Sequence, residues 1–145
     1  MGKRGRARKV SAANESRICF SRKIVRPIAI ESTKGAWYHK WHIVSVDGST
    51  LDIADEEGNE ETFGRPSSSR GESAFPQLRF VSLVENGTHV LFGTQMGGIN
   101  TGEQTLAKEV YSSLHAGMLC LGDRNFYGFE AWAEAKKTVP TCSGE

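Results

Sequence analysis

Two aspartates follow short apolar segments of strand length, where a carboxylate can bind a metal ion or act as a base. Residues 118–121 (MLCL) are apolar, lie between glycines and precede Asp123 by two positions; a run this short favours a strand over a helix. Residues 43–46 (IVSV) have the β-branched density of a strand and lead directly into Asp47. Chemistry in open α/β sheets lies beyond the carboxyl ends of strands. Both aspartates are therefore candidate ligands, although each also fits a turn, Asp47 as part of an Asp-Gly hairpin.

The segment between the two aspartates predicts a long loop and a hairpin. Residues 48–77 are acidic and then rich in Gly, Ser and Pro, which indicates a loop. Residues 78–84 and 89–96 have strand character and flank an Asn-Gly pair, the strongest short-range signal of a β-hairpin.

Two helices are expected after the hairpin. Thr101 and Gln104 have the spacing of a capping box, and apolar residues at helical spacing follow as far as about His115. A second helix is expected over residues 126–137, with Phe129, Trp132 and Ala133 facing inward, and it ends before Pro140.

The expected fold is α/β, with three antiparallel strands, a helix, a parallel strand and a second helix. A helical crossover returns the next strand parallel to the sheet. If residues 118–121 lie beside residues 43–46, Asp47 and Asp123 lie at the same end of neighbouring strands. Two carboxylates in that position can share Mg²⁺ (or Mn²⁺), with phosphate oxygens completing the coordination shell. This layout of a mixed sheet is ribonuclease-H-like.

Positive charge is concentrated at the N-terminus. Residues 1–27 carry nine Lys or Arg and one Glu (9 − 1 = +8), whereas residues 28–145 carry nine Lys or Arg and sixteen Asp or Glu (9 − 16 = −7). A basic arm over residues 1–32 can neutralise DNA phosphates; a disordered solubilising arm and a mitochondrial transit peptide are the alternatives. The candidate DNA-binding residues are Lys3, Arg4, Arg6, Arg8 and Lys9 in the arm, and Arg65, Arg70 and Arg124 beyond it.

The composition is that of a single globular domain. The chain has 145 residues, of which 38% are hydrophobic and 24% are charged, enough for one globular domain with its own core. It contains neither an apolar run of roughly 18 residues for a membrane helix nor the h-region of a secretory signal. Cys19, Cys120 and Cys142 are too far apart for a disulfide framework or a CxxC metal site, which favours a reducing cytoplasm.

Several segments, in order, resemble the DDE-class transposases of bacterial insertion sequences, in particular the insertion-sequence-four type. They are residues 46–52 (VDGSTLD), 63–66 (FGRP), 73–77 (SAFPQ), 101–107 (TGEQTLA) and 121–127 (LGDRNFY). The resemblance covers residues 37–137. It implies a ribonuclease-H-like catalytic domain over residues 33–138, with a tail at 139–145, and cleavage and transfer of DNA strands at element ends.

The resemblance assigns the first two catalytic, metal-binding acids of the family to Asp47 and Asp123. The family usually has Gly at the position of Asn125 and Pro at that of Ala54. Its third acid is a Glu on a downstream helix within a Tyr/Arg/Glu/Lys motif, and neither Glu130 nor Glu145 has that context. The expected domain is therefore C-terminally incomplete.

Three functions follow from these patterns. The first is a transposase core, weakly active or inactive alone, acting on DNA as a homodimer or with a complementary chain. The second is a non-catalytic DNA-binding or regulatory fragment, and the third is an inert remnant. No membrane partner is expected.

Overall fold

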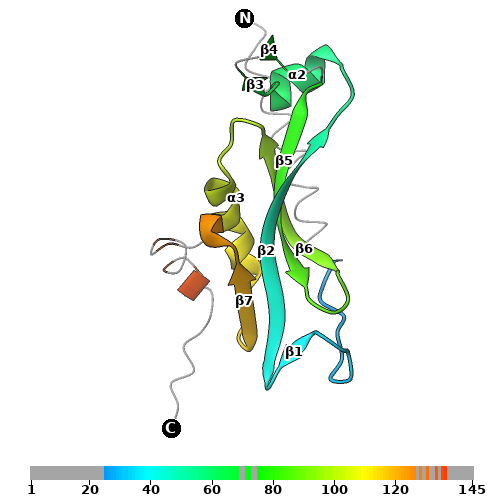
Figure 1. Ribbon diagram of the computed structural model, residues 1–145, viewed down its shortest axis with the longest axis vertical. Coiled ribbons are helices and arrows are strands. Elements are labelled where there is room, and N and C mark those ends of the chain that lie inside the picture. Colours follow the sequence, from blue (N-terminus) through cyan, green and yellow to red (C-terminus); the bar gives the residue numbers. More distant parts are fainter. Residues whose placement is uncertain are drawn as a thin grey trace, which may run out of the picture.

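The long strand β2 (Trp41–Asp52) is paired on both of its edges and forms the axis of a mixed sheet (Figure 1). It pairs antiparallel with β5 (Gln77–Glu85), and β5 pairs antiparallel with β6 (Leu91–Gly98). On its other edge β2 pairs in parallel with β7 (Met118–Gly122). The computed structural model describes residues 25–68, 71–72 and 75–126, with residues 128, 130, 133, 135 and 136.

The short elements lie around this sheet. Helix α3 (Glu103–Val110) continues into the 3-10 turn η1 (Tyr111–Ser113), and a second 3-10 turn, η2 (Arg124–Phe126), follows β7. The remaining elements are β1 (Trp37–Tyr38), which pairs with the start of β2, helix α2 (Glu57–Phe63), and the small hairpin of β3 (Ser67–Ser68) and β4 (Gly71–Glu72).

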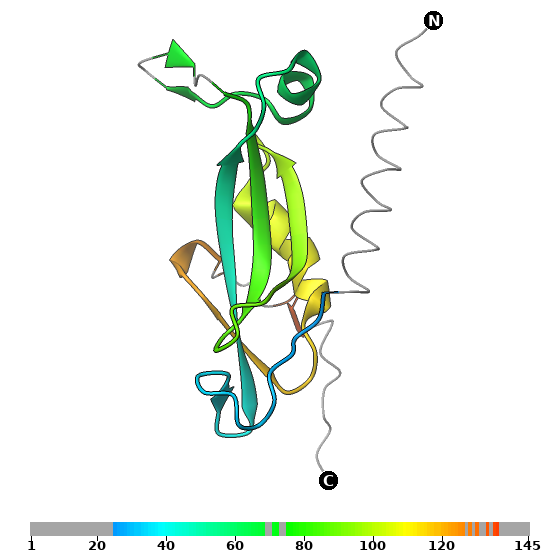
Figure 2. The same ribbon diagram turned by 90° about the vertical axis from the view of Figure 1, so that its right-hand side faces the viewer.

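The core lies between α3 and one face of the sheet (Figure 2). Strand residues that alternate toward α3 are buried, because alternate side chains of a strand point to the same face. The core contains Val44, Val46, Val81, Leu83 and Phe92 from the sheet, Leu106, Ala107 and Val110 from α3, and Tyr111, Leu114 and Phe126 from the segments that follow α3. On the other face, Leu91, Met96 and Leu121 are exposed.

The expected hairpin and the parallel return of the later strand are confirmed. The β5–β6 turn contains Asn86 and Gly87, and Gly87 has φ +92°. A Cβ at Gly87 would lie 2.6 Å from the carbonyl oxygen of Lys34, so the close approach of the two segments requires glycine. The mixed α/β class is likewise confirmed, and residues 130, 133, 135 and 136 are helical within the second expected helix.

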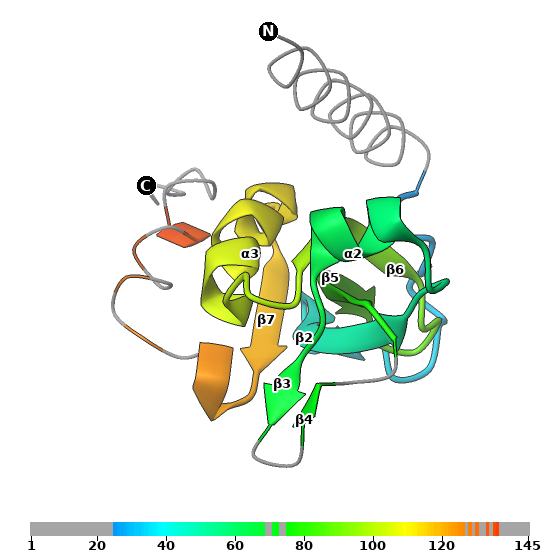
Figure 3. The ribbon, with the colours of Figure 1, turned by 90° about the horizontal axis from the view of Figure 1, so that it is seen from above.

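The segment expected as a long loop is shorter than predicted. β2 continues past Asp47-Gly48 to Asp52, and its register with β5 extends to the pair Asp52–Gln77. The Asp-Gly pair therefore lies within the strand and makes no turn. Helix α2 and the β3–β4 hairpin occupy much of the remainder, over one end of the sheet (Figure 3).

The predicted capping box is wrong. Helix α3 begins at Glu103 with Gly102 as its N-cap, and no side chain caps it. Gln104 instead donates from Nε2 to the carbonyl oxygen of Asn125 at 3.1 Å. A long-range contact thus replaces the local one that the spacing from Thr101 predicted. The α-helical part of α3 ends at Val110, before the predicted end near His115.

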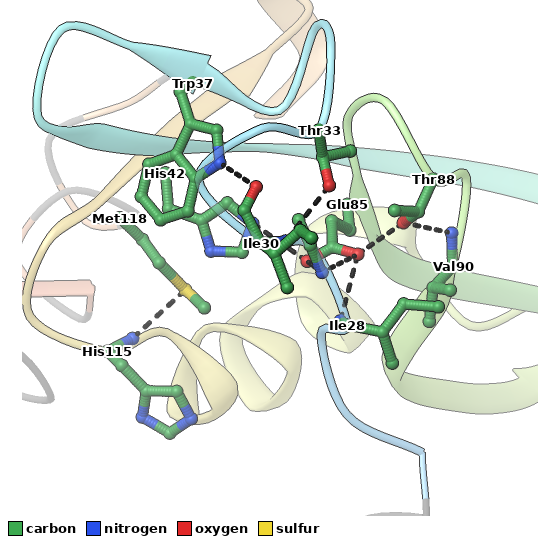
Figure 4. A network of polar contacts seen from close by, with 11 residues as sticks. Ile28, Ile30, Thr33, Trp37, His42, Glu85, Thr88, Val90, His115 and Met118 are labelled. Atoms are coloured by element: carbon green, nitrogen blue, oxygen red, sulfur yellow. Dashed lines mark hydrogen bonds and ion pairs between the residues drawn. The ribbon is translucent and has the colours of Figure 1, made fainter.

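Residues 25–36 approach the sheet through a buried carboxylate at the end of β5 (Figure 4). Glu85 is fully buried and accepts hydrogen bonds from the backbone N–H groups of Ile28 (3.1 Å) and Ala29 (3.0 Å) and from the hydroxyl of Thr88. His42 Nε2 lies 2.8 Å from Glu85 Oε1. Residues 28 and 29, which the sequence analysis counted with the basic arm, are therefore attached to the sheet.

Hydrogen bonding outweighs burial in setting the charge state of Glu85. Burial raises its pKa, but the hydrogen bonds from Thr88, Ala29 and Ile28 and the charge of His42 favour the carboxylate, so the pKa lies below its ordinary value of 4.5. A depressed carboxylate pKa adds stability that is present above the unfolded pKa and is lost as pH falls through the folded value.

We expect Glu85→Gln to lower the free energy of unfolding at pH 7 by about 1–3 kcal/mol, because the amide leaves buried donors without a charged acceptor. The difference between wild type and variant should shrink as the pH falls below about 4.5. Urea denaturation at several pH values measures both effects. Glu61→Gln is the control, since Glu61 is an exposed carboxylate on α2. A difference that stays constant down to about pH 3 would contradict the assigned role.

Candidate carboxylate site on β2 and β7

Asp47 and Asp123 each follow the last paired residues of the two parallel strands. The register of β2 and β7 ends with Val46 opposite Gly122, so Asp47 is the next residue on β2 and Asp123 is the first residue after β7. Neighbouring strands lie about 4.8 Å apart, which brings the two backbones within reach of one shared ligand. The sheet order places β2 and β7 side by side as the sequence analysis expected, and a shared metal ion between the two aspartates stays a prediction.

Alternation along β2 places Asp47 on the sheet face opposite α3. Val46 points into the core, so Asp47 projects away from it. Gly122 is on the core side of β7, where a Cβ would lie 2.9 Å from Val46 Cγ1 and 3.4 Å from Phe126 Cβ. Asp123 follows β7, and its carboxylate accepts from backbone N–H groups of η2. Glycine at position 122 allows β7 to lie close to β2 just before the aspartates.

Local hydrogen bonds hold both carboxylates. Asp47 Oδ1 accepts from the backbone N–H of Gly48 at 2.9 Å. Asp123 Oδ1 accepts from the backbone N–H groups of Asn125 (2.7 Å) and Phe126 (3.3 Å). Asp123 therefore makes the turn that begins η2, so the turn interpretation is confirmed for this residue. A turn role and a ligand role are compatible, because these bonds use Oδ1 and leave Oδ2 for a ligand.

A third carboxylate, Glu103, lies nearby on the other face. Its Oε2 accepts from Asn125 Nδ2 at 2.6 Å, and its Oε1 lies 4.0 Å from Arg79 Nε. A Cβ at Gly48 would lie 3.3 Å from Glu103 Cδ. Glu103 was not among the predicted site residues; its only signal was a place at the start of a predicted helix. Its contacts link α3 to the turn that contains Asp123.

The donors of the pair suit a hard divalent cation. Asp47 and Asp123 are both exposed, and carboxylate oxygens are the ligands that Mg²⁺ takes in proteins, often only one or two of them with phosphate oxygens and water. Among the described residues, no group of three or more His, Cys, Asp or Glu side chains is placed to hold a metal ion. The residues therefore fit a Mg²⁺ ion that is bound by the two aspartates and by phosphate oxygens of a ligand.

The predicted DNA-binding arginines differ in their surroundings. Arg124 is exposed at the start of η2, directly after Asp123. Arg65 instead pairs with Asp55 and with Glu60 (3.0 Å), and these carboxylates raise its pKa. It therefore neutralises the acidic end of the protein. Arg70 and the arm residues Lys3, Arg4, Arg6, Arg8 and Lys9 lie outside the described residues.

Charge is distributed unevenly along the sheet. Residues 48–64 contain six carboxylates and no Lys or Arg, and all six are exposed around the start and the length of α2. They are Asp52, Asp55, Glu56, Glu57, Glu60 and Glu61. β1 lies at the opposite end of β2 (Figure 1). A polyanion is therefore repelled from the α2 end, and Asp47 lies between the two ends.

No family model matches the chain, and neither a curated protein nor a solved structure does. In the part of the chain that the structure describes, helices of the length and apolarity needed to cross a membrane are absent.

We expect the chain to bind Mn²⁺ weakly, and expect Asp47→Asn or Asp123→Asn to weaken this binding at least about tenfold, because each removes one charged ligand. Asp52→Asn is the matched control, since Asp52 is an exposed acid on the same strand that accepts from Gln77. Electron paramagnetic resonance of free Mn²⁺ during titration measures the affinity. Equal binding by all four proteins would show that the metal is bound elsewhere.

Proposed function

We propose that the chain is part of a metal-dependent DNA strand-transfer enzyme of the DDE-transposase class, with a ribonuclease-H-like core and Asp47 and Asp123 as metal ligands. The observation that carries this proposal is that Asp47 and Asp123 each come directly after the last register pair, Val46 and Gly122, of two neighbouring parallel strands. The antiparallel trio, the helical crossover and the parallel return are consistent with that core. We place the activity in the cytoplasm and on insertion-element ends.

Asp47, Asp123 and Arg124 have different roles in the proposed reaction. Asp47 and Asp123 would hold a divalent cation, which when bound would supply electrophilic assistance to an in-line attack on a phosphodiester. Asp47 and Asp123 are held in fixed orientations by the backbone N–H groups that they accept from. Arg124, exposed beside Asp123, is placed to contact a phosphate of the DNA backbone. The two acids are an incomplete set for the class, so activity of this chain alone is weak or absent.

We expect purified chain to join DNA strands slowly or not at all in Mg²⁺ or Mn²⁺, because the third acid of the class is missing. A gel assay of labelled duplex transferred to plasmid measures joining, and efficient joining by the chain alone would contradict this expectation. Where a complementary chain restores joining, Asp47→Asn and Asp123→Asn should each abolish it and Asp52→Asn should not. Unchanged joining would remove both aspartates from the site.

The second candidate function is a non-catalytic DNA-binding fragment. It is favoured by the arm, where residues 1–24 carry eight Lys or Arg and one Glu, a balance of +7. Displacement of counterions by such an arm makes affinity fall steeply with salt.

For this candidate, we expect deletion of residues 1–24 to weaken duplex DNA binding and to flatten its salt dependence. The deletion keeps Ile28 and Ala29, so their bonds to Glu85 are preserved. Fluorescence anisotropy between about 50 and 200 mM salt measures the slope. An unchanged slope would assign the phosphate contacts to another part of the chain.

A further inference from the structure

The hairpin of β1 and the start of β2 presents two exposed aromatic rings beside basic side chains. Tyr38 is 58% exposed and Trp41 is 40% exposed. They are register partners in the antiparallel pair, so their side chains project to the same side. His39 and Lys40 form the turn between them and are also exposed.

Trp37 has a different role from these two rings. Its Nε1 donates to the carbonyl oxygen of Ile30 at 2.9 Å, and its ring stacks on His42 with 4.7 Å between centroids (Figure 4). His42 in turn contacts the buried carboxylate of Glu85. These contacts attach the base of the hairpin to the rest of the protein, and this holds the rings of Tyr38 and Trp41 at its tip in place.

The exposed rings lie on the same side of β2 as the carboxylate site. Trp41 and Asp47 are six residues apart on one strand, and alternation directs both away from the α3 face. At about 3.3 Å per residue, they are separated by about 20 Å. That length corresponds to about six stacked nucleotides at 3.4 Å each.

The charge around the hairpin favours an anionic ligand. Residues 25–42 carry the exposed cations Arg26, Lys34 and Lys40 against one acid, Glu31. Lys40 Nζ lies 5.4 Å from the centre of the Trp41 ring. The six carboxylates near α2 lie at the far end of β2. An aromatic pair among cations is what single-stranded nucleic-acid sites use, with bases on the rings and phosphates on the cations.

We propose that the hairpin of residues 37–42 is a binding site for unpaired bases of a nucleic-acid strand, with Tyr38 and Trp41 as the stacking rings and Lys34 and Lys40 as phosphate contacts. The site favours unpaired bases because a duplex hides the π-faces that the rings would cover. The proposal deepens the proposed function, since it places a frayed or single-stranded DNA segment on the side of the sheet that carries Asp47.

The test compares two probes of equal charge without metal. The full chain in EDTA is titrated with a twelve-nucleotide oligothymidylate and with an abasic oligonucleotide of the same length, followed by fluorescence anisotropy. We expect the thymidylate to bind roughly tenfold more tightly, because only it can stack. Equal affinity for the two probes would overturn the proposal.

Variants locate the site. Trp41→Ala and Tyr38→Ala should each lower thymidylate affinity roughly five- to a hundredfold and leave the abasic probe unchanged. Trp41→Phe should keep most of the affinity, since it retains a ring. Leu51→Ala is the matched control, because Leu51 is 53% exposed on the same face near the acidic end. Equal losses for both probes would instead indicate a change in charge or folding and would count against stacking.

This result can be told apart from that of the carboxylate site. Asp47→Asn and Asp123→Asn should still prefer the thymidylate to the abasic probe, because stacking at the hairpin requires no metal. If the wild type binds Mn²⁺ through the aspartates but does not prefer the thymidylate, the hairpin site alone is rejected. If it prefers the thymidylate but Mn²⁺ binding does not depend on the aspartates, the carboxylate site alone is rejected.

Discussion

The pairing of β2 along both edges is the constraint on which the rest of the structure depends. Its antiparallel partner β5 brings in the β5–β6 hairpin, and its parallel partner β7 requires a crossover, which α3 supplies. Because α3 must cross one face of the sheet, Val44 and Val46 become core residues and Asp47 is directed to the other face. The position of Asp47 is thus a consequence of strand pairing, whereas Asp123 lies in the turn between β7 and η2.

Charge and packing separate the two ends of this strand. One end carries α2 and its acids, with Arg65 held between Asp55 and Glu60. The other end carries Glu85, a single buried carboxylate surrounded by donors from three segments of the chain. A buried charge is tolerated only when it is hydrogen-bonded and paired. Glu85 therefore fixes the positions of residues 28–29, of the turn at Thr88 and of His42 relative to one another.

The sequence predicted those features that depend on local or periodic signals. Asn86-Gly87 located the hairpin, and the helical pattern before residues 118–121 implied the parallel return that pairs the aspartates. Features set by long-range contacts were missed. Gly48 belongs to a strand and lies close to Glu103, and Gln104 bonds to Asn125, 21 residues away. The backbone N–H donors to Glu85, from Ala29 and Ile28, are 56 and 57 residues away, and no spacing rule reveals them.

The parallel pairing of β7 with β2 also has consequences for how the chain folds. His42 pairs with Met118, a separation of 118 − 42 = 76 residues. Contacts this distant in sequence form slowly, because the loop between them must be closed before they contribute any stability. We expect the β5–β6 hairpin and α3 to form first and β7 to join last. Until β7 joins the sheet, Asp47 is present without the neighbouring strand that leads to Asp123.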